Sequence, residues 1–340
     1  MAHYGNLEAM EANRPEKLSL KRRLNGLMLE GFFTGMSKLG KLHRASNPAQ
    51  HGIEVLKNIP YVDDGQGAHL LDVWRPIERS GPCPVLIYVH GGAFSILSKE
   101  THWLMALLFA RQGFVVFNIN YRLAPRHPFP AAIEDACNAA TWVTKHAADY
   151  GGDRHRMVFS GESAGGNLAL SMMIACCYER PEPWATDLYE ANPGLIAVLP
   201  ACGLLEAGNL KRFKESGKVS PFVLDRMATA ELNYLPPTLP AGLDTTLANP
   251  LVFLEKGIPP QRPLVPNCAT VGTKDPLLYD TRRLKAALDA MNVPCEAHYY
   301  EGGLHGFHAF LFDPRARACW DDQYRFLHKY VDGLKRSDTG

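Results

Sequence analysis

The chain has 340 residues, of which 46% are hydrophobic and 21% charged, proportions typical of a folded soluble protein. Its 36 basic and 35 acidic residues nearly cancel, which argues against a nucleic-acid partner or an anionic membrane surface. No apolar run approaches the roughly 20 residues of a membrane span, and none in the first 50 residues suits a signal peptide. Eight cysteines without a C-x-x-C pair favour buried reduced thiols. We expect a cytoplasmic protein with no metal and no other cofactor.

Short apolar runs alternate with helical patterns through most of the chain. Residues 1–50 are polar with apolar side chains three or four positions apart, which predicts one or two amphipathic helices. Apolar strands are expected at 69–74, 84–89, 114–117, 156–159, 195–199, 264–271 and 297–300, and helices near 131–149, 167–178 and 315–335. This alternation predicts an α/β fold in which helices cover both faces of a mostly parallel sheet. Residues 203–248 interrupt it with charges and prolines, and an insertion of this length in an α/β core is usually functional.

A G-x-S-x-G motif lies between the strand expected at 156–159 and the following helix. It consists of Gly161, Glu162, Ser163, Ala164 and Gly165. This is the position of a nucleophile elbow, where a serine occupies a strained turn and small neighbours let strand and helix approach closely. A serine hydroxyl needs a base to take its proton and donors to stabilise the oxyanion. If Ser163 is a nucleophile, the chain must supply both.

A glycine-rich loop follows the strand expected at 84–89. Its sequence is His90, Gly91, Gly92, Ala93 and Phe94. Because glycines permit close backbone approach, amides of this loop can face the elbow of a neighbouring strand. We predict that the oxyanion hole consists of the amides of Gly92, Ala93 and Ala164, within an oxyanion loop that includes His90 and Gly91. A simple turn at the end of a strand is the alternative.

An acid and a histidine follow two later strands, in the order that a serine hydrolase of this type requires. Asp275 comes after the strand at 264–271, and His305 comes after the strand at 297–300. A neutral imidazole can accept the serine proton, and a carboxylate fixes its tautomer and stabilises the imidazolium. We predict His305 as base and Asp275 as acid. Asp280 is the rival for the acid, and His298 and His308 are the rivals for the base.

Five separated motifs resemble those of the hormone-sensitive-lipase-like family (family IV) of bacterial carboxylesterases. They span about residues 84–310 and comprise His90–Phe94, Tyr121–Ala132, Gly161–Gly166, Lys274–Leu277 and His305–Phe307. The resemblance implies an α/β-hydrolase fold whose helical cap consists of residues 1–50 and 203–248, around a core of residues 51–202 and 249–340. It also implies that the substrates are small-molecule esters with short to medium acyl chains. Ala93, Glu162 and Arg126 replace the glycine, aspartate and glutamate that are usual in the family.

The predicted function is ester hydrolysis through an acyl-enzyme on Ser163. The same residues would serve deacetylation of an arylamide or acyl transfer to an alcohol, and a lid-gated lipase is another alternative. A non-catalytic receptor, as in the plant gibberellin receptors of this fold, is disfavoured because that branch has lost the histidine that His305 supplies here. The candidates for an acyl pocket, with the core of the cap as the alternative role, are Phe32, Phe33, Phe213 and Phe222. The oligomeric state is left open, a homo-oligomer included.

Overall fold

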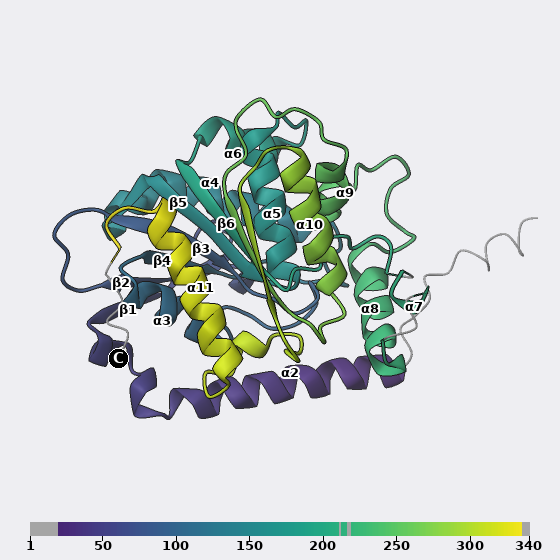
Figure 1. Ribbon diagram of the computed structural model, residues 1–340, viewed down its shortest axis with the longest axis horizontal. Helices are drawn as coiled ribbons and strands as arrows, with labels where there is room; N and C mark the ends of the chain where they lie inside the picture. The colour runs from purple at the N-terminus through teal and green to yellow at the C-terminus, as the bar shows by residue number, and fades with distance from the viewer. Residues whose placement is uncertain (1–19, 211, 216–218, 335–340) are drawn as a thin grey trace, which may run out of the picture.

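The computed structural model describes residues 20–210, 212–215 and 219–334, which form an eight-stranded sheet flanked by helices (Figure 1). The strands are β1 (Ile53–Pro60), β2 (Leu70–Pro76), β3 (Cys83–Val89), β4 (Val115–Ile119), β5 (Gly152–Glu162), β6 (Leu195–Ala201), β7 (Asn267–Gly272) and β8 (Cys295–Tyr300). Their order across the sheet is β1-β2-β4-β3-β5-β6-β7-β8. β2 runs antiparallel to both of its neighbours, and all the other pairs are parallel. The predicted α/β class with a mostly parallel sheet is confirmed.

Helices bury both faces of this sheet. One face is covered by α3 (Trp103–Arg111) and α11 (Pro314–Tyr330), and the other by α4 (Ala131–His146), α5 (Ala164–Cys177), α6 (Pro183–Ala191), α9 (Pro250–Glu255) and α10 (Leu278–Ala290). Because successive side chains of a strand point to opposite faces, β3 contributes Val85, Ile87 and Val89 to one core and Leu86 and Tyr88 to the other. A strand that is buried on both faces has the continuous apolar sequence that predicted it.

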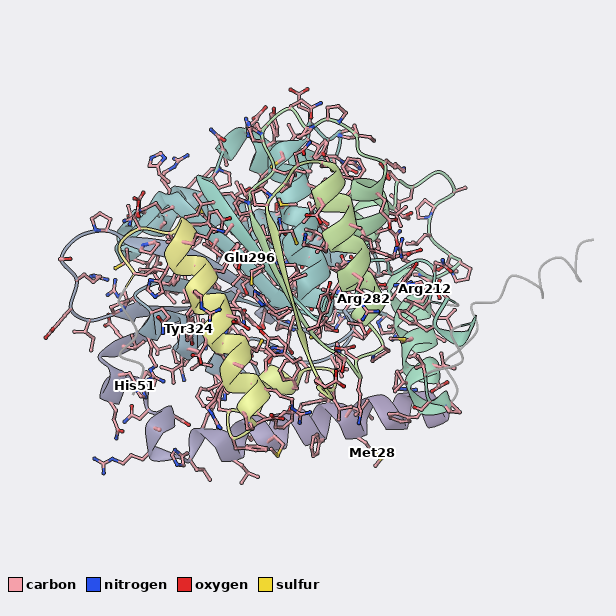
Figure 2. The ribbon with its side chains drawn as sticks, viewed as in Figure 1. Met28, His51, Arg212, Arg282, Glu296 and Tyr324 are labelled. Carbon is pink, nitrogen blue, oxygen red and sulfur yellow. The ribbon has the colours of Figure 1, made fainter. Side chains whose placement is uncertain are left out.

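A long helix, α2 (Leu20–Lys41), precedes the sheet and runs along one edge of the molecule (Figure 1). Its C-terminal half is tied to the core: the Ser37 hydroxyl donates to the carbonyl of Glu100 at 3.1 Å and accepts from the Trp103 indole at 3.0 Å. Met28, on its outer side, is 72% exposed (Figure 2). No helix in the described ranges is long and apolar enough to cross a bilayer.

In its described part, the insertion at residues 203–248 consists of short helical segments joined by turns and loops. It contains α7 (Arg212–Glu215), α8 (Pro221–Tyr234) and a 3-10 turn at Thr246–Ala248. Both of its ends are fastened to α5, because the buried Asn167 side chain donates to the carbonyls of Leu204 (2.8 Å) and Ala248 (3.0 Å). The insertion therefore leaves and rejoins the core beside the helix that follows Ser163.

The carboxyl ends of β3, β5, β6, β7 and β8 open at the same edge of the sheet, since these strands are parallel. Two glycines allow the turn between β5 and α5 to pack against β3. A Cβ atom at Gly165 would lie 2.0 Å from the carbonyl oxygen of Val89, and one at Gly161 would lie 2.4 Å from that of Gly165. Both are contacts with backbone, which cannot rotate away as a side chain can.

Substitution of Gly165 by alanine should therefore destabilise the fold. Because the new methyl group would overlap the backbone of β3, we expect Gly165→Ala to lower the free energy of unfolding by about 1–3 kcal/mol. Gly81→Ala is the matched control, since a Cβ there meets nothing within 4 Å, and it should change stability by less than about 0.5 kcal/mol. Urea unfolding measures both, and equal stability of the two variants would contradict the close approach.

Candidate active site

Ser163 lies in the turn between β5 and α5, at the N-terminal cap position of the helix. Its backbone has φ 53° and ψ −115°, a left-handed conformation that is strained for a residue with a Cβ atom. The neighbouring chain holds it in place: its N–H donates to the carbonyl of Ala201 at 2.9 Å, and its carbonyl accepts from the N–H of Leu204 at 3.1 Å. The fold thus maintains at Ser163 the strained turn that the motif predicts.

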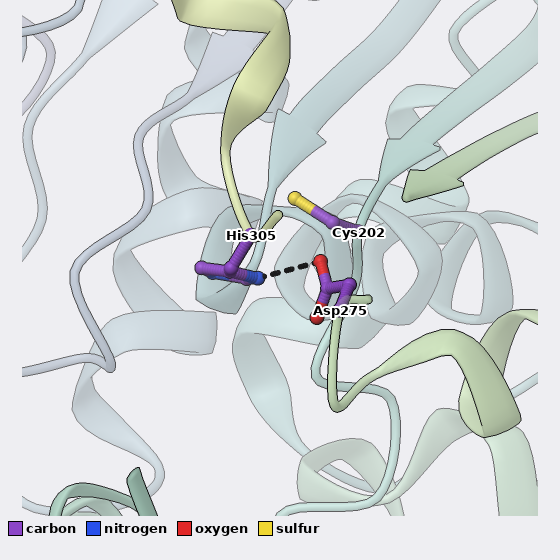
Figure 3. A group of neighbouring side chains, drawn as sticks. All are labelled: Cys202, Asp275 and His305. Atoms are coloured by element: carbon purple, nitrogen blue, oxygen red, sulfur yellow. Dashed lines mark hydrogen bonds and ion pairs between the residues drawn. The ribbon is translucent and has the colours of Figure 1, made fainter. Parts of the chain in front are cut away.

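Asp275 and His305 meet at the same edge of the sheet, although they come from different loops (Figure 3). Asp275 follows β7 and His305 follows β8, and the Nδ1 of His305 lies 2.9 Å from the Oδ2 of Asp275. The Asp275 side chain is fully buried, and its Oδ1 accepts from the N–H of Leu277 at 2.8 Å, so the carboxylate is fixed. The imidazole is 41% exposed. Part of the ring is therefore accessible from solvent.

The charge at Asp275 acts directly on the histidine. Partial burial of the ring lowers the pKa of His305, but the Asp275 carboxylate and the Cys202 sulfur together outweigh that effect, so the pKa is raised well above its usual value. The Asp275 carboxylate thus stabilises the imidazolium form.

The rival acid is engaged elsewhere. Asp280 lies inside α10, where its Oδ2 is 2.7 Å from a guanidinium nitrogen of Arg212 and accepts from the N–H of Leu205 at 3.1 Å. Both partners belong to the insertion. Figure 2 labels Arg212, which lies beside the helices of the insertion. Asp280 therefore joins the insertion to the core.

The rival histidines also have other partners. The Nε2 of His308 lies 2.7 Å from the Oε2 of Glu162, and the Nδ1 of His298 lies 3.5 Å from a carboxylate oxygen of Asp322. Among the candidates for acid and base, the structure brings together Asp275 and His305.

The loop after β3 makes a sharp turn beside the elbow. Gly92, Ala93 and Phe94 have φ values of 110°, 52° and 60°, and a Cβ atom at Gly92 would lie 2.1 Å from the carbonyl oxygen of Ile96. The N–H of Gly91 points at the Nε2 of His102, 3.3 Å away.

Three amides in this region have no such partner. Among the described residues, the amides of Gly92, Ala93 and Ala164 donate to no protein acceptor. These are the three amides that the sequence predicts for an oxyanion hole.

The insertion braces this loop. Phe94 is fully buried, and its ring stacks on that of Tyr234 with a centroid distance of 3.7 Å. Next to this stack, the side-chain amide of Asn233 donates to the Ser95 hydroxyl at 3.2 Å. Both partners lie near the end of α8, so the insertion contacts the oxyanion loop directly. Sequence reasoning missed Tyr234, whose only signal was an aromatic residue within the insertion.

Glu162, beside Ser163, is a largely buried carboxylate between two histidines. Its Oε1 lies 3.0 Å from the Nε2 of His102, and its Oε2 lies 2.7 Å from the Nε2 of His308. Burial alone would raise the pKa of Glu162, but the two imidazoles outweigh burial and hold that pKa well below its usual range. His102 follows the oxyanion loop, and His308 lies three residues after His305. One carboxylate thus connects the elbow with both neighbouring loops.

The four phenylalanines proposed for the acyl pocket fall in different environments. Phe32, Phe33 and Phe222 are 57%, 41% and 53% exposed, whereas Phe213 is buried in the main core. None of them lines the 810 Å³ cavity between the oxyanion loop and the loop that follows β4. That cavity is lined by Gln66, Gly67, Ala68, His90, Leu97, Ser98, Asn120, Tyr121, Arg122, Leu123, Ala124, Pro125, Arg126 and His127. The predicted triad and this cavity therefore have no residue in common.

Potential metal ligands gather at one place in the described part of the chain. Cys202, Asp275 and His305 each offer one ligand atom, and these atoms lie within 4.8 Å of one another. Six of the eight cysteines, Cys202 included, are buried free thiols.

The contacts of Glu162 with the two histidines predict that removal of its negative charge destabilises the protein. Glu162→Gln leaves two buried imidazoles without their carboxylate, so we expect the free energy of unfolding to fall by about 1–3 kcal/mol. Glu134→Gln is the matched control, because Glu134 makes a more exposed ion pair with Arg122 at 2.8 Å and its loss should cost less than about 1 kcal/mol. Chemical denaturation of both variants makes the comparison, and a smaller effect at Glu162 would contradict the account.

Comparison with known proteins identifies the family of the chain. A family model described as alpha/beta hydrolase fold matches residues 86–309. Esterase LipI of Mycobacterium tuberculosis is 32% identical over 245 residues, which cover 69% of each chain. The acetyl esterase of Salmonella choleraesuis is 30% identical over 240 residues, or 70% of this chain and 68% of that protein. Carboxylesterase NlhH of Mycobacterium tuberculosis is 44% identical over 101 residues, and the match spans only 31% of its length.

Solved structures share the fold over most of the chain. Esterase LipW from Mycobacterium marinum has a TM-score of 0.70 at 21% identity and covers 89% of each chain. An esterase from the archaeon Pyrobaculum calidifontis has a TM-score of 0.69 at 23% identity, covering 97% of this chain and 99% of that one. The family model matches more than half of the chain, and LipI exceeds 30% identity over more than two thirds of each chain. The chain belongs to the hormone-sensitive-lipase-like family of α/β hydrolases.

Proposed function

We propose that the protein is a carboxylesterase that cleaves short- to medium-chain acyl esters through an acyl-enzyme on Ser163. The observation that carries this proposal is the 2.9 Å contact between the buried Asp275 carboxylate and the Nδ1 of His305, at the sheet edge where the elbow lies. The names of the curated relatives, which include carboxylesterases and acetyl esterases, support the reaction class.

In this mechanism each residue has one task. The Asp275 carboxylate accepts a hydrogen bond from the Nδ1–H of His305 and so keeps the ring proton on Nδ1. Nε2 is then unprotonated and able to take the proton of the Ser163 hydroxyl. The serine oxygen attacks the ester carbonyl, and the imidazolium then returns the proton to the leaving alcohol. A water molecule, activated by the same nitrogen, releases the acid and restores the serine.

The oxyanion that forms in both steps needs donors that are already in place. The amides of Gly92, Ala93 and Ala164 suit this task, because they donate to no acceptor in the described part of the protein. Donors that need no rearrangement stabilise developing charge most strongly. The methyl group of Ala93, where the family usually has glycine, takes space near the acyl group.

We assign α2 and the insertion to a cap over this site. The stack of Tyr234 on Phe94 supports the assignment, because it joins the insertion to the oxyanion loop. Phe32, Phe33 and Phe222, whose rings are exposed, stay the candidates for the acyl pocket, whereas Phe213 packs in the core.

The assignment of the acid is tested by two substitutions of the same kind. Asp275→Asn should lower kcat for p-nitrophenyl butyrate by about 10³–10⁴-fold, because an amide stabilises the wrong histidine tautomer and cannot stabilise the imidazolium. Asp280→Asn is the matched control: it removes a buried charge of α10 that faces Arg212 and should lower stability while kcat stays within about threefold. A loss of kcat in Asp280→Asn alone would overturn the assignment.

The proposed acyl preference predicts an optimum in a series of p-nitrophenyl esters. Each added methylene contributes about 0.8 kcal/mol of binding while the pocket can bury it, and nothing beyond that point. We therefore expect kcat/KM to rise from acetate, to peak between butyrate and octanoate, and to fall for longer chains. An optimum at laurate or beyond would contradict the preference and favour a lipase.

A further inference from the structure

Cys202 is a buried thiol that the proposed mechanism does not use. It directly follows β6, is 2% exposed and has a left-handed backbone with φ 38°. Its N–H donates to the carbonyl of Thr270 at 2.7 Å, so the residue is fixed between β6 and β7. In Figure 3 its side chain stands next to the pair formed by Asp275 and His305. A soft ligand atom thus sits beside a nitrogen and an oxygen ligand.

A thiolate, an imidazole and a carboxylate are the ligand types that Zn²⁺ prefers. Around one tetrahedral zinc, with bonds of about 2.0–2.3 Å, the ligand atoms lie about 3.3–3.6 Å apart. The three atoms here already lie within 4.8 Å of one another. Side-chain rotations that move these atoms by about 1 Å would bring them to the spacing that a tetrahedral zinc requires. Three protein ligands would leave the fourth coordination position to water.

Two of the three groups are held in place before any metal arrives. Asp275 is anchored through its other oxygen by the N–H of Leu277, and Cys202 is anchored through its backbone. His305, which is 41% exposed, gives a metal ion access from solvent.

We infer that Cys202, Asp275 and His305 form an inhibitory binding site for a thiophilic divalent cation such as Zn²⁺. The metal ion would bind the thiolate sulfur, a carboxylate oxygen and the Nδ1 of His305, and the proton of the Cys202 thiol would pass to solvent. A neutral imidazole with metal on Nδ1 carries its proton on Nε2, the nitrogen that must accept the Ser163 proton. Metal binding therefore switches the histidine to the tautomer that cannot act as base. The inhibitory consequence rests on the proposed function, whereas the binding site itself does not.

This mode of inhibition has a kinetic signature. The metal ion occupies the side of the ring away from the serine, so it does not take the place of the ester. Zn²⁺ should lower kcat for p-nitrophenyl butyrate without raising KM, and a chelator should restore activity. Mg²⁺, which prefers oxygen ligands, should not inhibit.

The activity test compares Zn²⁺ titrations of the wild type, Cys202→Ala and Cys202→Ser, each normalised to its own metal-free rate. Loss of one ligand should raise the half-inhibitory Zn²⁺ concentration by at least about tenfold in both variants. Cys295→Ser is the matched control, because Cys295 is partly exposed at the start of β8, and it should behave as the wild type. Equal inhibition of the wild type and the Cys202 variants, or no inhibition of the wild type at millimolar Zn²⁺, would overturn the inference.

A second measurement does not depend on activity. Co²⁺ bound to a thiolate gives a sulfur-to-metal charge-transfer absorption, so one equivalent of Co²⁺ should produce this band in the Ser163→Ala variant. The band should be absent when Cys202→Ser is added to that variant, and its persistence would overturn the site. If the band behaves as expected but the wild type hydrolyses no ester, the proposed function fails while the metal site stands.

Discussion

The close backbone contact between the elbow and β3 is the constraint on which the rest of the site depends. Gly161 and Gly165 leave no room for a side chain against each other or against Val89. Because of this contact, α5 begins directly at the end of β5 and Ser163 is confined to a left-handed turn. The loop of residues 90–94 starts immediately after Val89, so the same contact sets its distance from Ser163.

Polar and aromatic contacts then join the surrounding loops to the elbow. Glu162 lies against histidines from the segment after the oxyanion loop and from the loop of His305. On the other side, the stack of Tyr234 on Phe94 ties the insertion to the oxyanion loop. A change in the insertion can therefore move the loop that contains Gly92 and Ala93 without touching Ser163. If these amides form the proposed oxyanion hole, this contact is a physical route from the insertion to the site.

The sequence predicted the parts of the molecule that local pattern and chain order determine. Strands buried on both faces have apolar runs, and the motif at Ser163 lies between a strand and a helix. The pairing of Asp275 with His305 followed from their places after successive strands, because neighbouring parallel strands bring such loops together. The helix ends predicted from the sequence were less accurate. In the structure α5 begins at Ala164 rather than near residue 167, and α11 ends at Tyr330 rather than near residue 335.

Other features depend on contacts that no local pattern carries. β1 lies at the edge of the sheet and is partly exposed, so Ile53–Pro60 lacks the apolar run that marks the inner strands. His102 and His308 meet Glu162 from distant parts of the chain, and nothing in their own surroundings distinguishes them from surface histidines. The phenylalanines proposed for the acyl pocket could not be placed for the same reason, since cap packing decides which rings face the site.

The central claim is that Ser163 is the activated nucleophile, and covalent labelling tests it most directly. The protein is treated with a fluorophosphonate, and the modified residue is mapped by peptide mass spectrometry. The account predicts one adduct per chain, on Ser163, and no labelling of the Ser163→Ala variant. An adduct on another residue, or labelling that persists in that variant, would contradict it.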